Sequence, residues 1–414
     1  MTRTTAPADI ESPRLARLVA ETRAHGRAAV DRFWRELAAA GAPLTEPVPG
    51  SADERLVTVV WRQDRPVEGV YVLANRVTDK HRFREGLMRP LPGTDVWYVT
   101  LRLPLGLRCG YRIHPFDADD PCLTAEGPRG GTFRELPDDR VDPLNRHADG
   151  PFGSLIELPG APSLAEWPTA RPTDRGEAFD FAAADGSVHR VRRFVPDDPG
   201  TGAAPGLLVV CDAEQWFDRY GIVAAVTAAV AAGRIPPLAV VGVESGPDVP
   251  SRMRQLGANP RFIDMLADEL LPYVVRGLPR APDRRNIMLC GQSLGGLTAL
   301  ATALRRPDAF GTVLAHSAST WWRPGMTARP RQWDEDADTW LYERAAAAPV
   351  GDVRIRMDVG RNEGPMVDDL RRLHALMARR GFDASLHVYT GGHDYACWAA
   401  ALMDGLAGAA APPA

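Results

Sequence analysis

A short glycine-rich segment carries the pattern of a serine nucleophile. Residues 291–296 read Gly-Gln-Ser-Leu-Gly-Gly and stand between an apolar run, 286–290, and a helix-like stretch, 294–304. Glycine-x-serine-x-glycine at a strand-to-helix turn is typical of a nucleophile elbow, where the serine hydroxyl is exposed on a sharp, strained bend. The alternative is a glycine-rich turn whose serine only caps the helix. The flanking elements favour Ser293 as a nucleophile.

A serine hydroxyl needs a neighbouring base to accept its proton, and the chain has nine histidines. Where a nucleophile elbow is used, the chain order is serine, acid, histidine, with the histidine late in the chain. His393 fits because it follows the apolar run 385–389, in a loop whose two glycines let it turn inward. His316, at the end of a predicted strand near the elbow, is the second choice. His374 and His387 lie within helix and strand patterns, and we interpret them as ordinary face residues.

The acid that orients the histidine is expected after the strand that precedes it in the sequence. That strand is predicted at 353–359, and the loop that follows it contains Glu363, our first choice. Asp358, on the strand itself, is the second choice. Each carboxylate has an alternative role in a structural ion pair, and a serine–histidine dyad without an acid is also open.

An oxyanion hole needs two preorganised donors. One is expected to be the backbone N–H of Leu294, directly after the nucleophile. The other is expected in the loop after the apolar run 206–211, from the N–H of Ala213 or Glu214. We interpret Asp212, in the same loop, as a turn residue.

Aromatic and cationic side chains are placed around these positions. Flat rings and guanidinium groups bind planar, anionic, aromatic ligands through stacking and charge. The alternative is that the tryptophans are half-buried packing residues and the arginines are solvated. Their joint placement favours a substrate-binding role for Arg252, Arg254, Trp216, Trp321, Trp322 and Trp398.

The second half of the chain has the pattern that would position these residues. After a hairpin around Asp185-Gly186, apolar runs alternate with helix patterns, which is typical of a mostly parallel sheet covered on both faces. With the elbow order, this predicts an α/β-hydrolase domain over residues 178–414. The strands are expected at 206–211, 238–243, 286–290, 312–316, 353–359 and 385–389, and the helices at 221–232, 261–275, 294–304, 366–380 and 395–407.

The first half has a different pattern. Apolar residues at helical spacing from Ser12 to Gly41 predict one or two amphipathic helices. Short β-rich runs then predict a small antiparallel β-sandwich, with strands at 55–61, 69–73, 95–103, 110–114 and 152–158. We expect a helical segment over residues 1–45, the sandwich over 46–165 and a proline-rich linker over 166–177.

Composition excludes several classes of protein. The 414 residues are 45% hydrophobic and 25% charged, with a formal net charge of −4, so neither disorder nor a nucleic-acid or anionic-membrane partner is indicated. No signal peptide and no apolar run long enough to span a membrane is present, so a soluble protein is expected. The five cysteines are odd in number and scattered, which argues against a disulfide framework or zinc site and fits the cytoplasm.

Longer segments go beyond these motifs. GQSLGG, HSASTWW, GRNEGPM and GGHDYACWAAALMDGL resemble the enterochelin (enterobactin) esterase family, the siderophore esterases. VVWR, RVTDKH, LPGTDVWYVTLRL and DPLNRHADG are similar to the small immunoglobulin-like domain of that family, so the resemblance covers nearly the whole chain. One departure is Ala213, where the family often has glycine.

The resemblance implies a cytoplasmic serine hydrolase that opens the ester bonds of a catecholate siderophore, such as the trilactone of ferric enterobactin, to release iron. By position it implies that Ser293 is the nucleophile, His393 the base and Glu363 the acid. Arg252 and Trp322 would line the catecholate pocket. The iron belongs to the ligand, so no cofactor and no protein-bound metal is expected, and the protein would be a monomer or small homo-oligomer.

Two alternatives differ in class. One is a general carboxylesterase or feruloyl-type acyl esterase of the same architecture, with a carbohydrate-binding β domain. The other is a non-catalytic protein that sequesters a siderophore, which the presence of both Ser293 and His393 disfavours.

Overall fold

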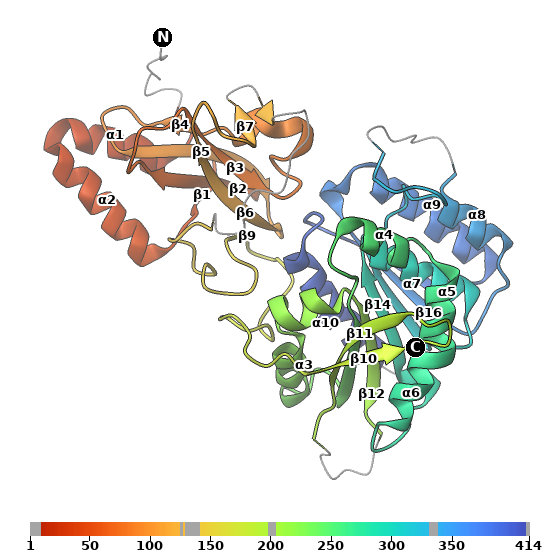
Figure 1. Cartoon of the computed structure of the whole chain (residues 1–414). Coiled ribbons are helices and arrows are strands. Elements are labelled where there is room, and N and C mark those ends of the chain that lie inside the picture. The colour runs from red at the N-terminus through yellow and green to blue at the C-terminus, as the bar shows by residue number, and fades with distance from the viewer. Residues whose placement is uncertain (1–9, 125–126, 129–140, 198–203, 331–337, 411–414) are drawn as a thin grey trace. The chain divides into compact units, whose positions relative to one another are not determined.

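The computed structural model describes residues 10–124, 127–128, 141–197, 204–330 and 338–410. The chain divides into two compact units (Figure 1). The first unit is residues 1–161 together with 390–396, and the second is residues 162–389 together with 397–414. Seven residues near the end of the chain, 390–396, therefore pack with the first unit, although the residues on both sides of them belong to the second.

The first unit begins with helices α1 (Pro13–His25) and α2 (Arg27–Ala40), which confirms the helical pattern. The Ser12 hydroxyl caps α1 by accepting a hydrogen bond from the N–H of Leu15 at 3.2 Å. Gly26, at φ 56°, separates the two helices. Their apolar faces pack with residues of the neighbouring sheet in one core: Leu15, Leu18, Phe33, Trp34, Val60 and Tyr98.

Two larger antiparallel sheets and the two-stranded ribbon β7–β8 follow in the described part of this unit. One has the order β1-β2-β5-β4 and the other β3-β6-β9. Val57 and Val99 from the first sheet share a core with Val70 and Ile113 from the second, as the alternating sequence pattern requires. The strands are β1 (Leu44–Val48), β2 (Ser51–Arg62), β3 (Gly69–Ala74), β4 (Arg89–Pro90), β5 (Val96–Pro104), β6 (Arg108–Phe116) and β9 (Leu155–Glu157). The short elements η2 (Lys80–Gly86), β7 (Leu123–Thr124) and β8 (Gly127–Pro128) complete it.

The second unit is built on a mixed sheet, which among the described residues has the order β10-β11-β13-β12-β14-β15-β16-β17. The hairpin β10–β11 is antiparallel, and β11 pairs antiparallel with β13, whereas every pair from β13 to β17 is parallel. The strands are β10 (Glu177–Ala182), β11 (Val188–Phe194), β12 (Gly206–Cys211), β13 (Leu238–Val243), β14 (Ile287–Gln292), β15 (Thr312–His316), β16 (Arg354–Gly360) and β17 (Ala384–Tyr389). The sequence pattern predicts the six strands from β12 to β17 to within two residues, and it places the hairpin β10–β11 around Asp185-Gly186.

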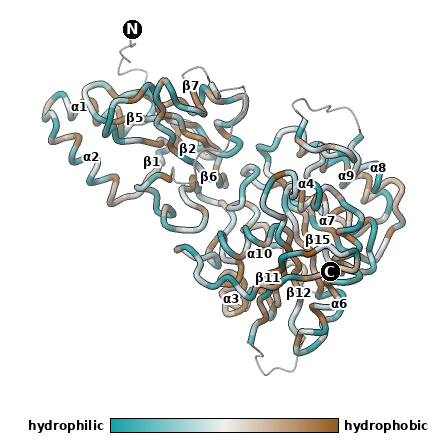
Figure 2. The backbone as a smooth tube through the Cα atoms, viewed as in Figure 1, coloured by the Kyte–Doolittle hydropathy of each residue, from teal (hydrophilic) through white to brown (hydrophobic). Residues whose placement is uncertain are grey.

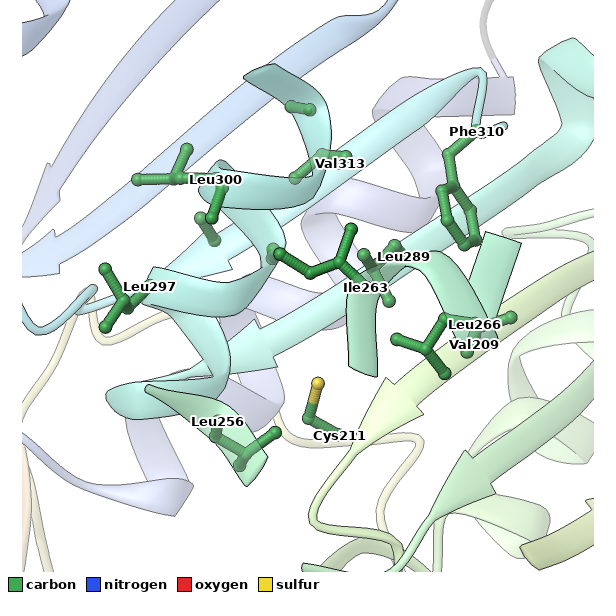
Figure 3. Close-up of a cluster of buried hydrophobic side chains, with 14 of the residues drawn as sticks. Val209, Cys211, Leu256, Ile263, Leu266, Leu289, Leu297, Leu300, Phe310 and Val313 are labelled. Carbon is green, nitrogen blue, oxygen red and sulfur yellow. The ribbon is translucent and has the colours of Figure 1, made fainter. Parts of the chain in front are cut away.

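Helices cover both faces of this sheet (Figure 1). On one face, Val209, Leu289 and Val313 of the strands pack with Leu297 and Leu300 of α7 in a large core (Figure 3). On the other, Gly405 of α10 lies against Leu314 of β15. The central strands are correspondingly hydrophobic (Figure 2). The helical elements are η4 (Glu214–Tyr220), α3 (Ile222–Ala231), α4 (Val249–Leu256), α5 (Pro260–Met265), η5 (Leu266–Leu270), α6 (Leu271–Arg276), η6 (Arg284–Asn286), α7 (Leu294–Arg305), α8 (Trp340–Ala347), η7 (Arg361–Glu363), α9 (Pro365–Arg380) and α10 (Tyr395–Ala410).

The parallel strands place their carboxyl ends at one edge of the sheet, where ligands bind in open α/β sheets. No helix in the described ranges is both long enough and apolar enough to cross a membrane.

Candidate active site

Ser293 lies at the strand-to-helix turn where the sequence predicts a nucleophile elbow. It lies between β14 and α7 with φ 55° and ψ −115°, a backbone conformation that is strained for a non-glycine residue. The bend is so tight that a Cβ atom on Gly291 would lie 2.1 Å from the carbonyl oxygen of Gly295. A Cβ on Gly296 would lie 2.8 Å from the carbonyl oxygen of His316. Glycine at both positions is therefore required for the helix to start this close to the strand.

A second serine, Ser319, contacts Ser293 and was not anticipated from the sequence. Its Oγ lies 3.3 Å from the Ser293 Oγ, and its N–H donates to the Ser293 carbonyl at 3.0 Å. Ser319 itself is fully buried. Ser319 follows β15, which pairs in parallel with β14, the strand that leads to Ser293. The residues directly after the strand next to β14 are therefore the place where a sequence search could find it.

Glu363, the first choice for the acid, lies in η7 directly after β16 and is 3% exposed. Its Oε1 accepts hydrogen bonds from the Ser317 hydroxyl at 2.5 Å and from the Gly360 N–H at 2.9 Å. The indole N–H of Trp398 donates to Ser317 Oγ at 2.8 Å. Burial, and then the Glu363 charge, raise the pKa of the nearby Tyr389 hydroxyl well above its usual value. Glu363 is therefore a buried carboxylate that hydrogen bonds hold in one orientation.

Asp358, the second choice for the acid, forms an ion pair with an arginine. Arg356 on the same strand donates to its two oxygens, from Nε at 2.9 Å and from Nη2 at 2.9 Å. The Nε2 atom of His316, the second-choice base, lies 3.8 Å from Asp358. His316 is fully buried, and burial lowers the pKa of its imidazole to about 4 although Asp358 opposes the shift. These contacts favour a structural role for both residues.

His393 lies in the segment 390–396, which packs with the first unit. The side-chain amide of Asn75 donates to the His393 carbonyl at 2.9 Å, and the Gly110 N–H donates to Asp394 Oδ2 at 2.5 Å. Asp79 is also near this segment. Burial raises the pKa of the Asp79 carboxyl, while the charges of Arg76, Arg82 and His393 oppose the rise. Asn75 and Gly110 come from distant parts of the sequence, so no local pattern points to them.

The expected oxyanion donors begin two neighbouring helices. Leu294 is the first residue of α7 and Ala213 immediately precedes η4, positions whose N–H groups have no acceptor within a helix. Because β12 and β14 pair in parallel, with Val210 opposite Cys290, both helices start at the same edge of the sheet. Helix N-termini stabilise negative charge. Glu214, the other candidate, has a carboxyl whose pKa is raised by burial and by Asp212.

The structure corrects one expected substrate contact. Trp216 is fully buried, donates from its indole N–H to Gln292 Oε1 at 3.1 Å, and packs against Trp167 with ring centroids 5.7 Å apart. Other residues of the second unit cover its ring completely. The expectation that Trp216 stacks on a ligand is therefore wrong.

The other aromatic and cationic residues are placed as follows. Trp322 and Trp398 are buried, and Trp322 packs edge-on against Trp340 at 5.2 Å. Trp321 is half-buried. Arg254 donates to Ser251 Oγ at 2.9 Å on an exposed part of α4, and Arg252 forms a bidentate ion pair with Asp212. Across the residues that the structure describes, no group of three or more histidine, cysteine, aspartate or glutamate side chains is arranged to hold a metal ion.

Comparison with known proteins decides the family. The family model described as "Enterochelin esterase, N-terminal" matches residues 56–167, and the one described as "Putative esterase" matches residues 186–409. The chain is 38% identical over 384 residues to the iron(III) salmochelin esterase of Escherichia coli O6:H1, which covers 90% of this chain and 92% of that protein. The chain belongs to the enterochelin esterase family. As a member of this family, it is an esterase.

Two further relatives support this assignment. The iron(III) enterobactin esterase of Dickeya dadantii is 31% identical to this esterase in an alignment 421 positions long, gaps included, that covers 92% of each chain. The crystal structure of the Shigella flexneri enterobactin esterase, solved in the presence of enterobactin, has a TM-score of 0.72 and 25% identity. That match covers 89% of this chain and 96% of the other. The second unit therefore has the α/β-hydrolase-like fold of the family, with its mixed sheet.

Proposed function

We propose that this esterase hydrolyses the ester bonds of a catecholate siderophore, such as the trilactone of ferric enterobactin, and thereby releases iron in the cytoplasm. The observation that carries the proposal is the strained Ser293 elbow beside a second helix N-terminus. It lies in a chain whose relatives are named for iron(III) salmochelin and iron(III) enterobactin.

The residues support an acyl-enzyme mechanism. His393 accepts the proton of the Ser293 hydroxyl while Oγ attacks the ester carbonyl carbon. The N–H groups of Leu294 and Ala213 stabilise the oxyanion that forms. The tetrahedral intermediate then expels the alkoxide, which takes the proton from His393 and leaves an acyl-serine. Water, deprotonated by His393, attacks the acyl carbonyl, and release of the carboxylic acid returns the proton to Ser293. Glu363 orients His393 and stabilises its cationic form.

Substrate binding is assigned to the cationic and aromatic residues that remain. Arg254, Trp321, Trp322 and Trp398 are our proposed contacts with the planar, anionic catecholate groups. We also propose that the sheets of the first unit form an immunoglobulin-like sandwich, spanning residues 46–165, that contributes to ligand specificity. In this proposal residues 166–177 are the linker, 178–414 the catalytic domain, and the protein is a monomer or small homo-oligomer.

The test follows the products of ferric and iron-free enterobactin by mass. Linear hydrolysis products are expected with the wild type, and Ser293→Ala is expected to lose at least about 10³-fold in kcat. Ser187→Ala, a serine on the exposed β10–β11 hairpin, is the matched control and should retain full activity. Hydrolysis that survives Ser293→Ala would refute the nucleophile. Turnover of feruloyl or acetyl sugars, with none of catecholates, would assign a general acyl esterase instead.

A further inference from the structure

The carboxylate of Asp212 is buried at the centre of a polar cluster in the second unit, and it is 1% exposed. Described residues give it four hydrogen bonds. Arg252 donates from Nε to Oδ1 at 2.6 Å and from Nη2 to Oδ2 at 2.8 Å. The Gln292 side-chain amide donates to Oδ2 at 2.7 Å, and the Ser245 hydroxyl donates to Oδ1. A bidentate guanidinium and two neutral donors fully satisfy this charge.

Arg252 lies on α4, and the other three residues of the cluster come from three adjacent strand ends. Ser245 follows β13, Asp212 follows β12, and Gln292 ends β14, and the sheet order places these strands side by side. Gln292 is also the residue directly before the nucleophile Ser293. The single Asp212 carboxylate therefore ties together the turns from which both expected oxyanion donors begin.

The backbone at Asp212 is strained in the same way as at Ser293. Its φ is 56°, in the left-handed region that non-glycine residues rarely occupy, so the surrounding contacts must hold it there. The Asp212 carbonyl accepts from the N–H groups of Gln215, at 3.0 Å, and Trp216, at 3.3 Å. These two bonds join the Asp212 carbonyl to the first turn of η4, and the Ala213 amide lies directly before that helix. The strained conformation of Asp212 therefore fixes the position of the Ala213 N–H.

We propose that Asp212 and Arg252 are a positioning pair for the oxyanion hole, which sets the spacing of the Ala213 and Leu294 amides and in which Arg252 balances the Asp212 charge. The proposal deepens the function proposed above and rests on its serine-hydrolase mechanism. It gives Arg252 a role different from the catecholate contact expected from the sequence.

The charge of Asp212 also affects the oxyanion. An uncompensated carboxylate next to the oxyanion donors would repel the negative charge that develops on the ester oxygen, and low solvent access makes that repulsion strong. Arg252 cancels this charge only while it is paired with Asp212. Removing Arg252 alone is therefore expected to slow the reaction of Ser293 more than removing both charges does.

The experiment uses two assays for each variant. One gives the rate constant for labelling of Ser293 by a fluorophosphonate, whose phosphonyl oxygen occupies the oxyanion hole. The other gives kcat and KM for ferric enterobactin. In Arg252→Gln, labelling and kcat should both fall about 100-fold with little change in KM, the scale of a lost or displaced oxyanion donor. Arg252→Lys keeps the positive charge but loses the bidentate geometry of the guanidinium. Its labelling rate constant and kcat should lie between those of Arg252→Gln and the wild type.

The double variant Asp212→Asn/Arg252→Gln carries the decisive comparison. It should label about 10-fold faster than Arg252→Gln, because it no longer leaves an unpaired carboxylate beside the oxyanion. The matched control is Asp264→Asn/Arg305→Gln, which removes an equivalent bidentate pair from exposed positions on α5 and α7. That control should be indistinguishable from the wild type.

Two results would overturn the proposal. One is a rise of KM in Arg252→Gln with labelling unchanged, which would make Arg252 a substrate contact. The other is a double variant that labels no faster than Arg252→Gln. A wild type that is labelled at Ser293 but leaves ferric enterobactin intact would contradict only the proposed substrate, because the labelling rates still decide the role of the pair. A wild type that is not labelled would overturn both.

Discussion

At the scale of single residues, the two acids after β15 differ in what already binds them. Asp358 is neutralised by Arg356 and faces His316, whereas Glu363 accepts hydrogen bonds from the Ser317 hydroxyl and the Gly360 N–H. A carboxylate held by neutral donors keeps its charge available to stabilise an imidazolium, whereas one paired with arginine has its charge compensated. This difference supports Glu363 as the triad acid.

We therefore expect Glu363→Gln to lower kcat by about 10²–10⁴-fold, because the imidazolium loses its stabilising charge. Asp358→Asn should change kcat by only a few-fold but should lower the unfolding free energy, since it leaves Arg356 without its partner. Steady-state kinetics and urea unfolding of both variants make the comparison. The reverse pattern, with kcat lost in Asp358→Asn and kept in Glu363→Gln, would move the role to Asp358.

His316 predicts a pH dependence of stability. Its imidazole has a pKa of about 4 in the folded protein, below the usual 6.5, because it is buried, with Cys290, Asp358 and Arg356 as neighbours. Between these values the unfolded chain binds the extra proton, so the unfolding free energy falls as the pH falls from 6.5 towards 4. The slope from this one group is at most about 1.4 kcal/mol per pH unit. Above pH 6.5 this slope fades, because the unfolded imidazole also loses its proton.

The variant His316→Gln should therefore lose less stability than the wild type between about pH 7 and about pH 5, whatever its stability at neutral pH. Urea unfolding at the two pH values measures both losses. Equal losses in the two proteins would mean that His316 has a normal pKa in the folded state.

Single residues also show what sequence can and cannot reveal about a site. Ser293 is recognisable because the glycines two and three residues away in the sequence permit its conformation. Trp216 was misassigned because its burial against Trp167 depends on a segment far away in the chain. Ser319 and the Asp212 cluster arise from strand neighbours in the sheet, which a one-dimensional pattern does not contain.

At the scale of elements, the elbow depends on how closely α7 follows β14. The added Cβ in Gly291→Ala would lie 2.1 Å from the Gly295 carbonyl oxygen, a backbone atom that can move only if the helix start moves. We expect this variant to lose about 2–4 kcal/mol of unfolding free energy and to be labelled slowly at Ser293.

Gly408→Ala is the matched control for this prediction. Gly408 lies on the exposed side of α10, where the nearest atom to an added Cβ, Arg356 Nη1, is 3.8 Å away. Its replacement should leave labelling unchanged and raise stability by up to about 1 kcal/mol through helix propensity. If Gly291→Ala behaved like Gly408→Ala, the tight approach of strand and helix would not be required.

The elements that sequence predicted best are those whose burial is uniform. The strands β12 and β13 are buried along their whole length and read as continuous apolar runs. The helices α4 and α8 were not predicted because each is only eight residues long and has a weak apolar pattern, which arginine and glutamine interrupt in α4 and glutamate and arginine in α8. Short helices of this kind are stabilised by the packing around them rather than by their own propensity.

At the scale of the whole molecule, the segment 390–396 departs from the order of the sequence. Periodicity treats residues 178–414 as one continuous domain, yet these seven residues pack with the first unit. The Arg108 N–H donates to the Thr390 carbonyl at 3.4 Å, and a Cβ on Gly392 would lie 2.5 Å from the Arg76 side chain. Such long-range contacts leave no periodic signal. In the mechanism proposed here, they mean that the first unit holds the loop of the general base.

Asn75 tests that role directly, because its side-chain amide donates to the carbonyl of His393 itself at 2.9 Å. We expect Asn75→Ala to lower kcat for ferric enterobactin by about 10-fold, since a small displacement of a general base is costly, while KM changes little. Gln63→Ala, which removes a surface amide elsewhere in the first unit, is the control and should leave kcat unchanged. Thermal unfolding should show the same midpoint for both variants, which separates a displaced base from a damaged fold. If Asn75→Ala kept the kcat of Gln63→Ala, the first unit would serve ligand binding alone, and the loop would depend on its two covalent ends for the placement of His393.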